Sequence, residues 1–339
     1  MHIIRSDMST IRVFRYTALF LATIILVSAT GLRYASAAER PAHLRMLSGP
    51  SGGQWHAAGE RLATILTHNI VPTTSRIGGG AANIVAIDKR LGDIGFTLTC
   101  LLGAAQTGEQ EFQSMITENV ALMTNVHPQV LYFLLRKDVA QKHGITDVAS
   151  LLQQRAPLRF ASLKPGSASE FILNIVLKYG YDTNYATLRA QGWLLEFGNY
   201  AELSDNFVEG KLDCFAYIGG TEVPLILSIE KHTEVVFLPI EQKVLDLLAA
   251  KFKTGTYTIM PGTYKSIAEP VTTLGDSTCI IVRKDLPDDL VYEITKTLWE
   301  NKASLVEAVK DFQSLSPKNA TPPGFDLHPG SKKFWDSVQ

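Results

Sequence analysis

The chain has little cysteine and no excess of positive charge. Three cysteines in 339 residues, with no CxxC spacing, exclude a disulfide framework and a zinc-ribbon type of centre. Lys and Arg number 32 against 33 Asp and Glu, and this balance argues against a nucleic-acid-binding protein. The eight histidines show no HExxH or other short ligand spacing. The sequence therefore predicts neither a metal centre nor a cofactor.

Long apolar runs are also missing, apart from a short one at the N-terminus. Three arginines within the first 15 residues precede an apolar stretch at 16–29, and small residues follow at Ala35-Ser36-Ala37. This order is typical of an export signal and its cleavage site. We therefore expect residues 1–37 to be a signal peptide cleaved near Ala37, and the mature protein to work in the periplasm. An uncleaved membrane anchor is the alternative.

Cleavage at this point changes the charge of the protein. It removes four arginines and one aspartate, which leaves 28 basic and 32 acidic residues and a formal charge of −4. Bulk charge then cannot attract an anionic solute, so local groups must hold one. The odd number of cysteines leaves at least one free thiol in an oxidising compartment. Buried, inert thiols are the simpler interpretation, and a Cys214–Cys279 disulfide is the alternative.

Strand-like and helix-like patterns alternate through the first part of the mature chain. A short strand is expected at 43–47, and apolar residues then recur at helical spacing from Trp55 to Leu66. Strands at 73–77 and 93–97 enclose a helix at 81–90. This βαβαβ order predicts a largely parallel sheet covered by helices.

The alternation breaks and then restarts. Residues 119–123 and 130–136 form two extended segments separated by His127-Pro128, which suggests a crossing into a second lobe. Beyond them we expect strands and helices, with Pro287 opening a long final helix, an irregular proline-containing tail and no internal repeat. The expected strands are 158–162, 193–197, 212–218, 235–238 and 278–282, and the expected helices are 169–179, 200–209, 223–229 and 288–309.

The fold class that follows is α/β, with two lobes that each contain a mostly parallel sheet flanked by helices and that are joined by hinge strands. Lobe 1 is expected to comprise residues 38–128 plus 274–339, and lobe 2 residues 129–273. Open parallel sheets bind ligands outside the carboxyl ends of their strands. Four loops at such ends are rich in Gly, Ser or Thr: residues 48–55, 77–83, 164–170 and 219–224. The backbone amides of these loops lie at helix N-termini and are suited to bind a small anion. Binding of this kind requires no catalytic group.

Three of these loops leave alternatives open. Gly49-x-Ser51-x-Gly53 matches the nucleophile elbow of serine hydrolases, although fewer than 20 mature residues precede Ser51 and no HGGG-type oxyanion motif occurs. A secreted hydrolase that uses Ser51 is therefore the enzyme alternative. Asn83 either contacts a ligand or braces its turn, and Ser169 either contacts a ligand or caps a helix.

The ionisable side chains near these loops give a weaker signal. His56 follows the first loop but is more simply a helix-surface residue. Lys164, Arg76 and Arg45 lie beside the loops in sequence and could pair with a carboxylate, although each could equally be solvated.

In order and spacing the loops resemble the TAXI family of solute receptors for tripartite ATP-independent periplasmic (TRAP) transporters. Ser48 to Gly59 is similar to that family's first-strand motif, with Trp55 where Tyr is commoner. Gly78 to Asn83 is similar to its TGGSxxN segment with Gly80 in place of serine, and Pro165 to Ser169 is similar to GxPGSGT with Ala168 in place of glycine. Further similar segments are 93–96, 212–224 (DAxFxxxGxP), 260–264 (PAGTY) and 327–330 (HPGA).

The resemblance implies a type II periplasmic binding protein that closes on a small carboxylate, which could be a dicarboxylate, an amino acid or a keto acid. It also implies a TRAP-type membrane permease as partner and no enzymatic activity. An orphan receptor for an ABC permease or a sensor kinase is the alternative. Together with the loop amides, the resemblance indicates these ligand-binding residues: Ser51, Gly53, Gln54, Trp55, Gly79, Asn83, Ser167, Ser169 and Thr221.

Overall fold

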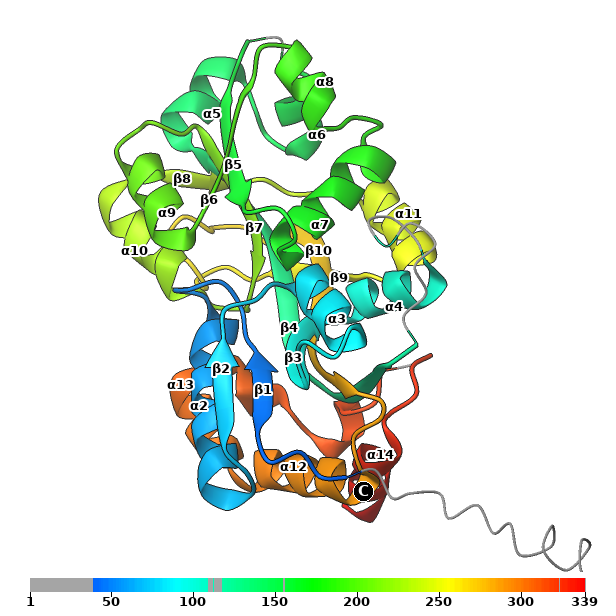
Figure 1. Ribbon diagram of the computed structural model, residues 1–339. Coiled ribbons are helices and arrows are strands. Elements are labelled where there is room, and N and C mark those ends of the chain that lie inside the picture. Colours follow the sequence, from blue (N-terminus) through cyan, green and yellow to red (C-terminus); the bar gives the residue numbers. More distant parts are fainter. Residues whose placement is uncertain (1–38, 109–111, 113–117, 155, 323, 339) are drawn as a thin grey trace, which may run out of the picture. The chain divides into compact units, whose positions relative to one another are not determined.

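Two long strands run antiparallel through the middle of a ten-stranded mixed sheet. β4 (Val120–Arg136) and β10 (Val271–Arg283) pair with each other over most of their lengths. Figure 1 shows them side by side, with groups of shorter strands flanking them. The computed structural model describes residues 39–108, 112, 118–154, 156–322 and 324–338, and the export signal expected at 1–37 lies outside these residues.

The first group of shorter strands has the predicted βαβαβ order. β1 (Leu44–Leu47), β2 (Thr73–Arg76) and β3 (Ile94–Leu98) are parallel, and β3 pairs with β10. α2 (Gln54–Asn69) and α3 (Gly80–Asp88) connect these strands. Every residue of β3 is buried, as expected for a strand that is covered on both faces.

The second group repeats this order on the other side of the long strands. β5 (Arg159–Leu163), β6 (Leu194–Gly198) and β7 (Cys214–Gly219) form parallel pairs, and β7 pairs with β4. β1 lies between β2 and β3 in the first group, and β5 lies between β6 and β7 in the second. The two groups therefore share one topology, although no internal repeat stands out in the sequence. The connecting helices are α7 (Ala168–Ile175), which continues as a π-helical turn at Val176–Gly180, α8 (Tyr185–Ala190) and α9 (Tyr200–Val208).

The remaining elements pack around these two groups. β8 (Val235–Phe237) pairs with β4, and β9 (Gly255–Ile259) pairs with β10. The other helices are α4 (Thr99–Thr107), α5 (Lys137–His143), α6 (Val148–Leu152), α10 (Pro224–His232), α11 (Gln242–Phe252), α12 (Asp288–Glu300), α13 (Lys302–Ala308) and α14 (Pro329–Ser337). None of the helices in the described residues is long and apolar enough to cross a bilayer.

Three expectations need correction. The two extended segments at 119–136 are one strand that includes Pro128, and β10 accommodates it with register shifts at Thr278/Cys279 and Ile280/Ile281. The long helix expected at 288–309 divides at Asn301, whose side chain donates to the Thr297 carbonyl at 2.8 Å and so ends the first segment. The tail is not wholly irregular, because the helix α14 begins at Pro329 and its residue Trp335 is buried.

The thiols follow the simpler of the two interpretations. Cys100, Cys214 and Cys279 are all buried and free, so the structure contains no Cys214–Cys279 disulfide. Burial raises the pKa of each thiol well above its usual value, which keeps the three groups protonated and unreactive.

Residues 40–339 form a single compact unit. The expected lobe boundaries at 128/129 and 273/274 fall inside β4 and β10 and stay a prediction.

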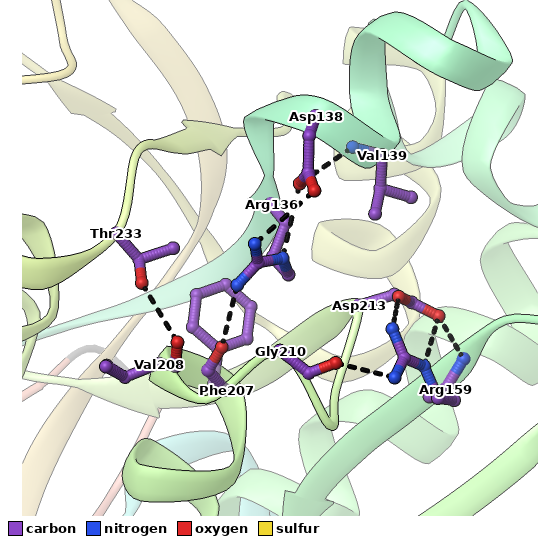
Figure 2. A network of polar contacts seen from close by, with 9 residues as sticks. All are labelled: Arg136, Asp138, Val139, Arg159, Phe207, Val208, Gly210, Asp213 and Thr233. Carbon is purple, nitrogen blue, oxygen red and sulfur yellow. Dashed lines mark hydrogen bonds and ion pairs between the residues drawn. The ribbon is translucent and has the colours of Figure 1, made fainter.

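The same ion pair joins the amino ends of the strands in both groups. The guanidinium of Arg45 donates to both oxygens of Asp93 at 2.9 Å, and the Arg45 amide donates to Asp93 Oδ2 at 2.8 Å. Arg159 binds Asp213 in the same way through its side chain and its amide, as Figure 2 shows. Each aspartate precedes the third strand of its group. The pairs therefore fix the first strand to the third within each group.

The Arg45–Asp93 pair predicts a pH-dependent stability. Burial tends to raise the pKa of Asp93, but hydrogen bonds and charge from Arg45, with Arg283 nearby, outweigh it and lower that pKa. The stabilisation is therefore present above the unfolded pKa of about 4 and is lost as the pH falls through the folded value. We expect Asp93→Asn to lower the free energy of unfolding by about 1–3 kcal/mol at pH 7, and the difference from wild type to shrink below about pH 4.

Denaturant unfolding followed by circular dichroism at several pH values measures this difference. The matched control is Asp289→Asn, because Asp289 pairs with Arg40 on the surface, where an ion pair contributes little. An Asp93→Asn variant as stable as wild type at pH 7 would contradict the prediction.

Candidate functional site

A small central cavity, of about 40 Å³, lies between loops from both strand groups. The loops that follow β1, β5 and β7 all reach it at the carboxyl ends of their strands, where the parallel sheet predicted a site. None of the described residues around it has a charged side chain. Its lining consists of Pro50, Gly53, Gln54, Trp55, Gln129, Leu163, Ser167, Ala168, Ser169, Tyr200, Ile218 and Gly219.

A larger outer groove, of about 520 Å³, adjoins the same loops. It brings together Ser51 and Gly79 from the first strand group with Lys164 and Ser167 from the second. Ser167 borders both the groove and the central cavity. Of the nine predicted binding residues, seven therefore line one of these two spaces. Asn83 and Thr221 line neither.

The first turn of α2 is the main source of unpaired donors in the central cavity. Gly53 is the N-cap of this 16-residue helix and no side chain caps it. The His56 amide is bonded to the Gly53 carbonyl at 3.1 Å, so the amides of Gln54 and Trp55 are the ones that stay available. The positive end of the helix dipole lies at the same place. Gly52 has φ +83°, which favours glycine, and a Cβ on Gly53 would lie 2.8 Å from the ring of Tyr200. Both glycines are therefore needed for this turn to approach the second group of strands.

Trp55 is fixed on the floor of the cavity. Its indole Nε1 donates to the Thr278 hydroxyl at 2.9 Å, and its ring stacks on Phe96 with centroids 6.1 Å apart. Thr278 belongs to β10, so the cavity is connected directly to one of the two long strands. Gln129, from the other long strand, lies beside it and contacts His127 at 3.3 Å.

Asn83 braces the loops rather than facing the central cavity. Its Nδ2 donates to the carbonyls of Ser48 and Phe96, each at 2.8 Å, and its Oδ1 accepts from the Gly79 amide at 3.0 Å. The side chain is buried and all its strong bonding positions are occupied by backbone groups. Of the two interpretations left open by the sequence, the geometry favours bracing.

The two serines of the second group hold the opposite wall. Ser167 Oγ accepts from the Glu170 amide at 3.2 Å and caps α7. Ser169 Oγ accepts from the Ile218 amide at 3.2 Å and so connects α7 to β7. Both side chains also border the central cavity. They therefore combine capping or bracing with a position from which a hydroxyl can reach a ligand.

The cations suggested by the sequence do not enter the central cavity. Arg45 is bonded to Asp93 at the amino end of β1, away from the loops. Arg76 is exposed and borders neither the cavity nor the groove. Lys164 lines the outer groove. His56 is half-buried on α2 and lines neither space.

Two of the cavity residues with polar side chains, Gln129 and Tyr200, were not predicted from the sequence. Tyr200 follows β6, whose carboxyl end was a fifth loop of the same kind, but this loop has too few Gly, Ser and Thr residues to be selected. Gln129 comes directly after His127-Pro128, where the crossing was expected but no ligand contact was sought. The signal available in the sequence was the position of each residue next to the end of an expected strand. Among the described residues, no cluster of three His, Cys, Asp or Glu side chains is placed to hold a metal ion.

Comparison with known proteins identifies the class. The structure of MatC from Rhodopseudomonas palustris, with bound malate, matches with a TM-score of 0.52 and 13% identity, over 88% of this chain and all of that one. The alkanesulfonate-binding protein SsuA from Xanthomonas axonopodis pv. citri, bound to MOPS, has a TM-score of 0.44 and 14% identity, over 89% and 86% of the chains. The fold is that of a two-lobed periplasmic binding protein. The NMT1-like family matches residues 46–337, and the chain belongs to this family.

One close approach between the two walls can be tested directly. A Cβ on Gly80, at the start of α3, would lie 3.0 Å from Ala168 Cβ at the start of α7, and 2.8 Å from Leu101 Cδ1. The TAXI motifs that these two segments resemble have serine at the position of Gly80 and glycine at the position of Ala168. In this chain the side chain that occupies this space is therefore on α7, at Ala168, whereas in the TAXI motifs it is on the helix that corresponds to α3. We expect Gly80→Ser to destabilise the protein by about 1–3 kcal/mol through overpacking.

The double variant Gly80→Ser with Ala168→Gly is expected to recover at least about 0.5 kcal/mol relative to additivity. Denaturant unfolding of both single variants and the double variant, without ligand, measures this coupling. Ala168→Gly alone is the control for the lower helix propensity of glycine. Strictly additive effects would show that the two positions do not share this space.

Proposed function

We propose that this protein is an extracytoplasmic solute-binding receptor that captures a small carboxylate between its lobes and delivers it to a TRAP-type membrane permease. The carboxylate is a dicarboxylate, an amino acid or a keto acid. The observation that carries the proposal is the central cavity, which is closed by loops from both strand groups and lined by the uncapped start of α2. Membership of the NMT1-like family supports it.

Neutral donors can account for binding of an anion at this site. A charge-assisted hydrogen bond contributes about 1.5–3 kcal/mol, so three or four of them supply most of the roughly 8 kcal/mol of a micromolar complex. The first-turn amides of α2, the hydroxyls of Ser167 and Ser169 and the amide of Gln129 are suitable groups. The small volume of the cavity favours a short ligand over a large one.

Closure of the lobes is the mechanism that fits this arrangement. The α2 amides and Trp55 belong to the first strand group, whereas Ser167, Ser169 and Tyr200 belong to the second. A ligand that contacts both sides stabilises the closed arrangement because it binds that arrangement better than the open one. The permease then recognises the closed form.

A thermal-shift screen against C4 to C6 carboxylates, amino acids and keto acids tests the ligand class, and isothermal titration calorimetry follows any hit. A ligand at about 100 times its dissociation constant adds roughly 2.7 kcal/mol to the free energy of unfolding. We therefore expect a clear rise in Tm for at least one member of the panel. If no member binds, the proposed substrate class is wrong.

With a ligand in hand, two variants distinguish the central cavity from the outer groove. Ser169→Ala should raise the dissociation constant by about 10-fold or more through the loss of a charge-assisted hydrogen bond. Lys164→Ala should change it little, because Lys164 lines only the groove. Ser228→Ala, on the exposed surface of α10, is the control. The opposite ranking of Ser169→Ala and Lys164→Ala would move the binding site to the outer groove.

Uptake assays in proteoliposomes test the partner. A candidate permease from the same organism is reconstituted, and labelled ligand is supplied together with the receptor. Uptake that requires an ion gradient but no ATP supports a TRAP-type partner. Uptake that requires internal ATP would instead show that the receptor serves an ABC permease.

A further inference from the structure

We infer that Asp311 is a positioning residue that holds the two sides of the cleft together and sets how far the receptor closes before ligand arrives. This inference rests on the proposed function and concerns regulation of the same site. Asp311 lies in a short 3-10 turn at Lys310–Ser314, directly after α13, and is 5% exposed. It does not line the central cavity.

Four hydrogen bonds form a closed ring around this carboxylate, which we call the Asp311 clasp. Asp311 Oδ2 accepts from Gln54 Nε2 at 3.0 Å and from the Thr221 amide at 3.2 Å. Asp311 Oδ1 accepts from the Thr221 hydroxyl. Gln54 Oε1 accepts from the Gly220 amide at 2.8 Å, which completes the ring.

The clasp crosses the cleft. Gln54 and Asp311 fall in the expected lobe 1, whereas Gly220 and Thr221 follow β7 in the expected lobe 2. Three of the four bonds therefore join the lobes, and all of them are made by groups of the protein itself. Opening would separate Thr221 from the carboxylate and expose both to water. A buried carboxylate is costly unless donors surround it, so these bonds favour the closed arrangement.

Glycine is required at the centre of the clasp. A Cβ on Gly220 would lie 2.0 Å from Asp311 Oδ2 and 2.3 Å from Gln54 Oε1. A side chain at position 220 would therefore displace the ends of the Asp311 and Gln54 side chains and break the bonds of the clasp.

The loop that carries Gly220 and Thr221 is held rigidly from the side of lobe 2. Tyr132 Oη donates to the Gly220 carbonyl at 2.7 Å, and Tyr264 Oη accepts from the Val223 amide at 2.8 Å. The two tyrosine hydroxyls are 3.2 Å apart, and both side chains are buried. The lobe 2 half of the clasp is thus preorganised, so less conformational entropy is lost when the lobes close.

The clasp acts on the ligand site through Gln54, which borders the central cavity while its amide is bonded to Asp311 and Gly220. Gln54 and Thr221 were predicted to contact the ligand. Their bonding in the structure instead suggests that both side chains link the lobes. If the closed fraction of the free receptor falls, the apparent dissociation constant rises in inverse proportion.

Distance measurements in the absence of ligand test the inference. Spin labels on Glu60→Cys and Ser228→Cys, both exposed, one on α2 and the other on α10, report the separation of the lobes by pulsed electron paramagnetic resonance. The native cysteines are buried and should not react. We expect one dominant short distance in wild type, and a longer or broader distribution in Asp311→Asn and in Thr221→Val.

Matched variants separate the clasp from a general loss of structure. Thr221→Ser keeps the hydroxyl and should retain the wild-type distribution, whereas Thr221→Val keeps the shape and loses the donor. Asp326→Asn, at an exposed acidic position, should have no effect. If Asp311→Asn does not fold, the Thr221 pair still decides the outcome. Unchanged distances in the folded Asp311→Asn and Thr221→Val variants would overturn the inference.

The result is independent of the proposed function because no ligand is used. Longer distances in a protein that binds no carboxylate would support the clasp and refute the proposed substrate class. Normal ligand binding with unchanged distances would refute the clasp and leave the proposed function intact. With a ligand identified, Thr221→Val should also raise its dissociation constant by about 10-fold, in line with a reduced closed fraction.

Discussion

The antiparallel pairing of β4 with β10 is the constraint on which the rest of the structure depends. β10 pairs with β3 of the first group and with β9, and β4 pairs with β7 of the second group and with β8. The two βαβαβ units are thus parts of one continuous sheet, and their loops meet at its carboxyl edges. Both strands also contribute to the floor of the cavity. Thr278 of β10 accepts a hydrogen bond from Trp55, and Gln129 of β4 lines the cavity itself.

The local pattern was sufficient to predict the strands of the two βαβαβ units and most of their connecting helices, although α8 was overlooked. Apolar runs and glycine turns marked β1 to β3 and β5 to β7, and the four predicted loops border the cavity or the outer groove. The break at Asn301 was not predictable, because the helical pattern continues through it. Helix α11 was overlooked although Val244, Leu245, Leu248 and Phe252 have helical spacing. The repeat was hidden because its strands share geometry and an Arg–Asp pair rather than an obvious sequence motif.

The motifs could not show which groups each side chain bonds, because the bonding partners are distant in sequence. Thr221 bonds a carboxylate 90 positions away, and Gln54 bonds the same carboxylate 257 positions away. Side-chain type alone suggested that both residues face a ligand, since an amide and a hydroxyl are suited to either role. Asn83 shows the same ambiguity, which only its three backbone carbonyl partners resolve. Motifs thus located the loops, whereas the direction of each side chain depended on tertiary packing.

The proline inside β4 has a mechanical consequence. Pro128 has no N–H group, so the ladder between β4 and β10 loses one donor next to the register shift at Thr278/Cys279. Each βαβαβ unit, by contrast, is fastened internally by its Arg–Asp pair. We therefore expect a bending load on the sheet to concentrate near Pro128, with less deformation within the units on either side. This short stretch of backbone adjoins Gln129, which lines the cavity.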